Sequence, residues 1–312
     1  ANNQSGLLNG ISSTDASTSN SKGIDHYYSA TKTPAYAHSY MLSAVLSDDY
    51  VDSDATPGPS PDDLGSYVKF SYKSVKDFEW RNPIQANTAY HNEGMRSDRT
   101  DDKGSFVYGK KDLYYTEKIE TKNYVAVFTF EPRKDGRSAS GRTGGINTSD
   151  AQSMVLLRKI TLYSKPDYNA NSANLALATP IKEVVFDYNY SLCRNYPGND
   201  ENTSTDVTKG GKLTLIGIHF TYQNSKKMKY RNYQFSYGTA GTRLNPNYHI
   251  KGSDRWGTYK EPVSASLSES LITTPLNNSD FPYSEQDPVK ANDYASAWNL
   301  VKIELPSGGE IN

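Results

Sequence analysis

The feature that most constrains this chain is alternation, because apolar or aromatic residues recur at every second position along many short stretches. Side chains of a β-strand point alternately to its two faces, so this period indicates strands rather than helices. β-Branched and aromatic residues, which suit a pleated surface, fill these stretches. The sequence predicts strands over residues 67–72, 124–130, 158–164, 181–190, 212–222, 230–237 and 300–305.

A pair of aromatic residues spaced by two closes strand after strand, and this spacing puts both rings on one face. Because Phe has no polar tip, we expect the Phe rings to be buried and to sit deeper than the Tyr rings. A Lys-apolar-x-Leu pattern also recurs, at 159–162, 212–215 and 302–305. The two recurrences predict an all-β fold of repeated antiparallel hairpins in a large sheet or shell-like scaffold. The alternative is that the pairs reflect no repeating unit, because any antiparallel sheet rich in Tyr and Phe would contain some of them. The pairs are Phe70/Tyr72, Phe128/Phe130, Phe186/Tyr188, Phe220/Tyr222 and Phe235/Tyr237.

Helix is predicted at only one or two short segments. Residues 287–298 combine Asp287 as N-cap, Pro288 at the first helical position and several alanines. Residues 149–157 form a second candidate, and residues 36–46 fit either a helix or a buried strand, of which we predict the strand. Stretches rich in Gly, Asn, Asp and Ser at 133–150 and 194–211 predict long surface loops.

Composition points to many half-exposed sheet faces. The chain has 25 Tyr but 9 Phe, and a Tyr ring with its polar hydroxyl suits a half-buried position. A single cysteine, Cys193, excludes an intrachain disulfide, and a long Asn/Ser/Tyr-rich chain of this kind favours a bacterial exported protein over a cytosolic enzyme. The net charge of −1 gives no reason to expect a nucleic-acid partner, and no segment approaches the length of a membrane span.

The polar opening predicts that residues 1–30 are a linker or surface excursion and that residues 31–312 form the β-scaffold segment. At the other end, Leu305 closes a strand, residues 306–309 are turn-forming, and Glu310 begins a returning strand. The shortness of that return predicts that the chain is a piece of something larger, truncated at its C-terminal end.

The densest acidic stretch, residues 48–63, is a weak calcium candidate. Asp52, Asp54 and Asp63 fall at positions 1, 3 and 12 of a calcium-binding loop. Pro57 stands where that loop needs Gly, and Asp63 replaces the usual Glu. The favoured interpretation is a solvated acidic turn, with Ca²⁺ as the alternative and no other cofactor expected.

Residues 253–260 are a weak candidate for contact with a ligand or partner through Arg255, Trp256 and Tyr259. Arg and aromatic side chains on a loop are suited to stack on a sugar or grip a protein. The favoured alternative is structural, with Trp256 filling a core and Asp254 capping the turn.

The remaining chemistry-bearing residues give no catalytic pattern. The five histidines are not at metal-ligand spacings, and the nucleophile and phosphate-loop motifs are absent. We therefore predict no catalytic residue. Carboxylate pairs of glycoside hydrolases meet only in the fold, so a carbohydrate-active enzyme stays open as a third choice.

Several motifs together resemble the RHS/YD-repeat-type large secreted or surface proteins of Bacteroidetes. In such chains, strands ending in Phe-x-Tyr alternate with Lys-Leu-x-Leu strands, as in residues 210–222, and Asp-x-Trp-Gly-x-Tyr follows, as in 254–259. The resemblance covers roughly residues 155–312. It implies a scaffold of stacked hairpins, which in some relatives encloses a toxin. The Tyr-Asp-x-x-Gly-Arg repeat and the self-cleavage motif are missing here.

These observations predict a non-catalytic β-scaffold segment of a large exported protein, located outside the cell or on its surface. The expected partner is the remainder of the parent polypeptide or another exported protein, without nucleic acid and without direct membrane insertion. The alternative is an adhesin module that binds a glycan or a host surface.

Overall fold

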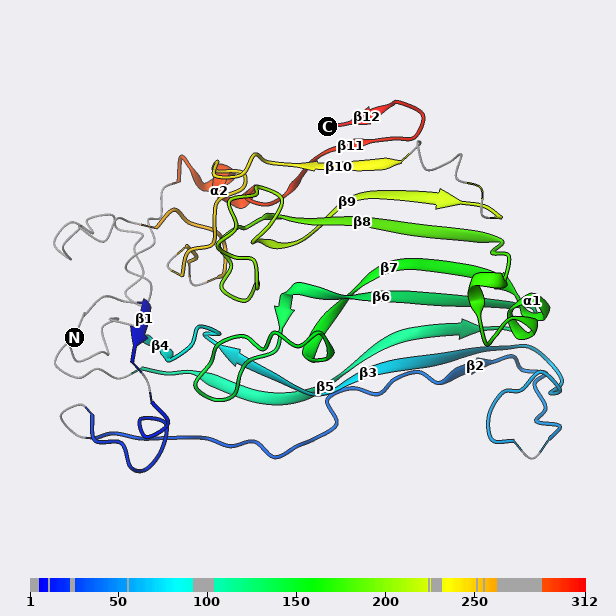
Figure 1. The fold of residues 1–312 in the computed structure, drawn as a ribbon, viewed down its shortest axis with the longest axis horizontal. Coiled ribbons are helices and arrows are strands. Elements are labelled where there is room, and N and C mark those ends of the chain that lie inside the picture. The colour runs from blue at the N-terminus through cyan, green and yellow to red at the C-terminus, as the bar shows by residue number, and fades with distance from the viewer. Residues whose placement is uncertain are drawn as a thin grey trace.

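The computed structural model describes residues 6–10, 12–22, 26–54, 56–91, 104–223, 225, 232–250, 252–254, 256–262 and 288–312. Its main element is one sheet of ten antiparallel strands (Figure 1). In spatial order from one edge to the other, the strands are β12 (Glu310–Ile311), β11 (Leu300–Glu304), β10 (Tyr233–Tyr237), β9 (Lys212–Thr221), β8 (Lys182–Leu192), β7 (Ser153–Ser164), β6 (Tyr124–Arg137), β5 (Val107–Glu120), β3 (Tyr67–Asn82) and β2 (Ala44–Leu46).

The order of strands across the sheet follows their order along the chain, except that β4 (Thr88–His91) leaves it. β4 pairs instead with β1 (Gly6–Asn9), so part of the predicted linker is in a small second sheet. Successive hairpins build the main sheet, which is open at β2 and at β12 in the described part of the chain. This confirms the predicted all-β class with a large antiparallel sheet.

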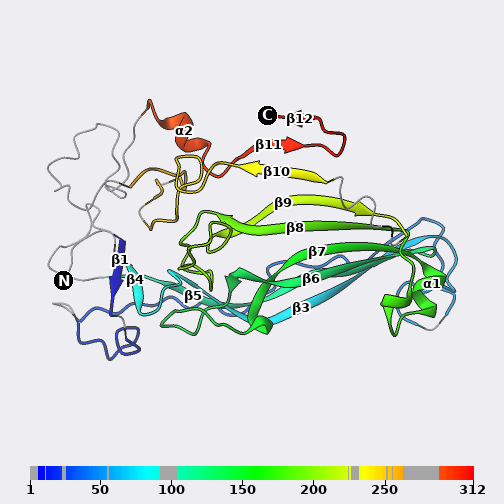
Figure 2. The same ribbon diagram turned by 45° about the horizontal axis from the view of Figure 1, so that its top comes forward.

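Two short α-helices lie at opposite ends of the sheet (Figures 1 and 2). α1 (Lys165–Ala170) begins where the Ser164 hydroxyl accepts a hydrogen bond from the Asp167 amide, and Pro166 occupies its first turn. α2 spans Ala291–Ala295. Two 3₁₀ turns, η1 (Asp150–Gln152) and η2 (Leu175–Leu177), complete the helical structure of the described residues. No helix in the described ranges is long and apolar enough to cross a bilayer.

Every stretch predicted as a strand contains one, and the last hairpin is also confirmed. The Leu305 amide donates to the Gly309 carbonyl, and Gly308 takes the left-handed conformation that the turn needs. The sequence missed β5 entirely and placed the end of β3 at residue 72 instead of Asn82. Both missed segments carry many charged residues, which hide the alternation.

The helical predictions were partly wrong. Residues 149–157 form only η1 and then enter β7, because Ser153 and its neighbours pair with β6. α2 begins at Ala291 rather than after Asp287, which lies outside the described residues. In the segment 36–46, only Ala44–Leu46 is a strand, and the residues before it are extended and exposed.

The chain exposes far more surface than a compact protein of its size. Its accessible surface is 18753 Å², whereas a compact chain of 34.7 kDa exposes about 13,000 Å². The buried apolar cluster formed by Tyr259, Tyr294 and Ala297, with Trp298 packed against it, is small. In the described part of the chain, the sheet therefore does not pack over a large apolar core.

Candidate functional site

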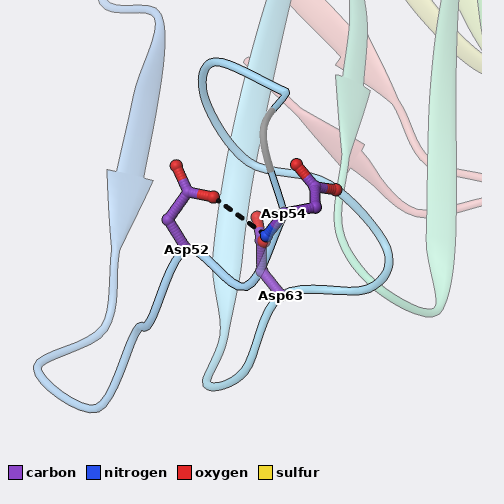
Figure 3. Close-up of side chains that lie close together, drawn as sticks. All are labelled: Asp52, Asp54 and Asp63. Atoms are coloured by element: carbon purple, nitrogen blue, oxygen red, sulfur yellow. Dashed lines mark hydrogen bonds between the residues drawn. The ribbon is translucent and has the colours of Figure 1, made fainter.

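The acidic loop between β2 and β3 brings its three candidate carboxylates together. One oxygen each of Asp52, Asp54 and Asp63 lies within 4.8 Å of the others (Figure 3). Asp52 and Asp54 are exposed, whereas Asp63 is only 1% exposed. The sequence thus predicted the grouping of these residues correctly, and its use as a metal site stays a prediction.

Protein donors already satisfy the inner carboxylate. Asp63 accepts hydrogen bonds from the amides of Ser53 (3.0 Å) and Ser60 (2.7 Å) and from the Tyr50 hydroxyl (2.8 Å). The two amide bonds and the Tyr50 bond lower the pKa of Asp63, and the same Asp63 bond raises the pKa of Tyr50 to about 12. The loop is therefore held by its own hydrogen bonds around Asp63.

The second carboxylate is also bonded within the loop. Asp54 accepts from the Ser60 hydroxyl (2.8 Å) and the Thr56 amide (2.6 Å), which lower its pKa. Asp52 accepts a long bond of 3.4 Å from the Asp54 amide. A calcium ion, which takes six to eight oxygen ligands, would compete with these donors. The geometry fits a self-bonded acidic turn more readily than a calcium loop.

In the predicted contact loop, residues 253–260, one aromatic side chain is exposed and the other is buried. Trp256 is 75% exposed, so the prediction that it fills a core was wrong. Tyr259 is buried instead, against Tyr294 and Trp298, with ring centroids 5.7 and 5.3 Å away. The Asp254 side chain accepts from the amides of Trp256 (2.9 Å) and Thr258 (3.0 Å), as expected of a turn cap. Arg255 lies outside the described residues. Tyr259 thus has a packing role, and Trp256 is the available contact residue.

Two other candidate side chains lie inside the fold. Burial raises the pKa of the Cys193 thiol to about 11, which disfavours the reactive thiolate. His219 is buried on β9, and its Nδ1 lies 3.1 Å from a carboxylate oxygen of Asp187 on β8. Among the described residues, the Asp52–Asp54–Asp63 group is the set of three close ligands.

The sheet itself presents a feature that sequence reasoning missed, which is the contrast between its two faces. We define the charged face by the ionisable side chains that the strand pairings place on it. They are Lys69, Lys118, Glu120, Lys159, Glu183, Asp187, His219, Lys302 and Glu304, with Tyr67, Val125, Thr161 and Tyr163 between them.

The opposite face, which we call the apolar face, carries the other residues of the same pairings. They are Val68, Phe70, Ile119, Ala126, Phe128, Ile160, Leu162, Val184, Phe186, Ile218, Phe220, Tyr233, Phe235 and Ile303.

The charged face is the more buried of the two. Val125 is fully buried, and Thr161, Tyr163 and His219 are each less than 9% exposed. Ion pairs join neighbouring strands here, including Lys159–Glu183 at 2.6 Å. Several charged side chains of this face thus pair across strands, although those of Lys159 and Asp187 stay 35% and 38% exposed.

At one end, α1 closes the charged face. Lys165, its first residue, and Lys118 both contact Glu120, at 2.6 and 2.8 Å. The Tyr168 ring lies 6.2 Å from the ring of Tyr163. Burial alone would raise the pKa of Glu120, but the bonds to Lys118 and Lys165 lower it.

Every residue of the apolar face, in contrast, is only half-buried. The rings of Phe186 and Tyr188 stack with centroids 6.4 Å apart, which places them on one face as predicted. Phe220 and Tyr222 also share a face, because the Lys182 ammonium lies over both rings, at 4.5 and 5.6 Å. Phe220 is deeper than Tyr222, which is 44% exposed, as expected. The expectation that the Phe members are buried was wrong, because no second layer of described residues covers them.

A third region, where the loops after β6 and β8 meet, is held by charge. Arg137 is buried and binds Asp200 (2.6 Å) and Asp150 (2.7 Å). The bonds from Arg137 lower the pKa of Asp150. This network fastens the two long loops to each other, so its role is structural.

No protein-family model matches the sequence, and no curated protein matches it either. Any statement about function therefore rests on the residues and the geometry described above.

Proposed function

We propose that this chain is a non-catalytic β-scaffold segment of a large exported bacterial protein, similar in construction to RHS/YD-type proteins. The observation that carries the proposal is the open sheet, in which hairpins follow one another in chain order. Such a sheet is extended by adding hairpins at an edge, without rearranging its interior.

The two edge strands of the main sheet support the proposal that further strands extend the scaffold. The sides of β12 and β2 that face away from the sheet are unpaired in the described part of the chain. Unpaired backbone groups at an edge favour pairing with another strand. The partner in this proposal is the rest of the parent polypeptide or another exported protein.

Localisation of the intact protein tests this proposal. Cells that produce it would be fractionated, and whole cells would be treated with a protease that does not enter them. We expect the protein in the medium, or on the surface where the protease removes it. Recovery in the cytoplasm, protected from protease, would contradict the exported-scaffold function.

A binding module is the second candidate, and the exposure of Trp256 favours it. A Trp ring that is 75% exposed beside Gly257 offers a flat surface on which a sugar ring could stack. A glycan array would test this function with Trp256→Ala as the variant and Tyr124→Ala, another exposed aromatic, as the control. Glycan binding lost only in Trp256→Ala would favour the adhesin over the scaffold.

A further inference from the structure

The apolar face lies open along the whole sheet. Its residues come from the described strands from β3 to β11, and none of them is buried. A sheet with one apolar face normally packs against a second layer, which stabilises it by removing apolar area from water. In the described part of the chain, the layer that should cover this face is missing.

The apolar face carries very little charge, and this restricts which kind of partner could cover it. Lys182, paired with Leu162, is its one charged side chain within the described pairings, and its ammonium lies over the ring of Phe220. A partner with a charged surface would gain nothing here and would have to bury its charges. A second copy of the same face brings one charge, its own Lys182, and that ammonium already lies over the rings of Phe220 and Tyr222. The cost of burying charge is therefore lower than for a partner with a charged surface.

The area of the face fits a dimer interface. The eight strands from β3 to β11, spaced ~4.8 Å apart, span about 34 Å, and about four paired residues per strand cover ~14 Å. The product is roughly 480 Å² of flat sheet. Side chains that project from the sheet add accessible area to this flat value, which brings the face to the order of the ~800 Å² that each partner buries in a standard interface.

We propose that two copies of this chain pack their apolar faces together, sheet on sheet, in a two-fold symmetric dimer. Packed sheets lie about 10 Å apart with their strands within about 30° of each other, which lets the half-buried rings interdigitate. A two-fold interface uses the same patch on both subunits, as this self-complementary face requires. The inference goes beyond the scaffold function and does not depend on it.

Adjacent residues of β6 provide a matched test. Phe128 lies on the apolar face opposite Ile160, and Thr129 lies on the charged face opposite Lys159. Sedimentation equilibrium of residues 1–312 over a wide concentration range would give the dimer Kd. We expect a dimer for the wild-type protein and for Thr129→Glu, whose carboxylate meets Lys159. Phe128→Glu should raise the Kd at least about a hundredfold, because it buries an unpaired carboxylate.

A second variant covers the case in which Phe128→Glu does not fold. Ile303 lies on the apolar face near the edge, where a charge disturbs the monomer less, so Ile303→Glu should also weaken the dimer. A wild-type protein that stays monomeric at all concentrations would overturn the proposal. A dimer that Phe128→Glu and Ile303→Glu leave intact would also overturn it. So would a monomer that binds neutral lipid vesicles through this face.

Discussion

The two faces of the sheet come from the same strands, yet they reverse the usual relation between polarity and burial. On the charged face, Glu120 and His219 are buried, whereas on the apolar face Phe186 and Phe220 are only partly buried. Cross-strand ion pairs and helix α1 cover part of the charged face within the single chain. Apolar side chains cannot do this, because their stabilisation needs a second surface. The comparison indicates that residues of the single chain cover the charged face in part, whereas the described residues leave the apolar face without a covering layer.

The largest effect should come from breaking the charged face. Glu120→Gln leaves Lys118 and Lys165 without their shared carboxylate in a largely buried site. Removing one partner of a buried pair is strongly destabilising, so we expect a loss of about 2–4 kcal/mol in the free energy of unfolding. Urea denaturation would measure it.

A surface pair provides the control for Glu120→Gln. Glu131 and Arg158 form an ion pair at 2.8 Å in which both side chains are about a third or more exposed. Glu131→Gln should therefore cost less than about 1 kcal/mol. Equal losses in the two variants would show that the charged face is not closed as described.

A smaller effect is expected from truncating the apolar face in the monomer. Phe186→Ala and Phe220→Ala each remove a half-buried ring, so each should cost about 1–2 kcal/mol rather than the larger amount typical of a core Phe. Denaturation must be measured at a concentration below the dimer Kd. Cys193→Ser is the control and should change stability little. Complete unfolding of both Phe variants would show that these rings are buried.

Acid should weaken the charged face while leaving the apolar face unaffected. Bonds to Lys residues outweigh burial and lower the folded-state pKa of Glu120 and Glu183 below the ordinary value of 4.5. The stabilisation from these groups is therefore complete above that value and is lost as pH falls below it through the folded-state pKa. The free energy of unfolding should be flat from pH 7 to 6 and fall below pH 4.5.

The double variant Glu120→Gln/Glu183→Gln tests the origin of that slope. It should be less stable at pH 7 and lose less on acidification than the wild-type protein. An unchanged slope would assign the acid sensitivity to other carboxylates.

The smallest expected effect concerns calcium. Asp54 and Asp63 already accept hydrogen bonds within the loop, so millimolar Ca²⁺ should leave the melting temperature unchanged. A bound ion would raise it by mass action. A rise in the wild-type protein that Asp52→Ala/Asp54→Ala abolishes would identify a genuine calcium site.

The sequence predicted most of the sheet because alternation records which residues face the same way. It located β8 and β9 through their aromatic pairs, and the proximity of Asp52 and Asp63 through loop spacing. It missed β5, whose charged residues hide the period, and α1, although the Ser-Lys-Pro-Asp start was a visible signal.

The burial of the charged face could not be predicted from the sequence. Lys159 and Glu183 meet only because β7 and β8 pair in one register, and a shift by one residue would separate them. Alternation also does not tell which face of a strand is covered. The expectation of buried Phe residues failed for this reason.

Hydroxyl-radical footprinting of dilute protein, read by mass spectrometry, tests the contrast between the two faces most directly. Phe186, Phe220 and Phe235 of the apolar face should be oxidised readily, whereas Tyr67 and Tyr163 of the charged face should be protected. At concentrations above the dimer Kd, the three Phe residues should also become protected. Protection of both faces in dilute monomer would reveal a covering layer and contradict the account.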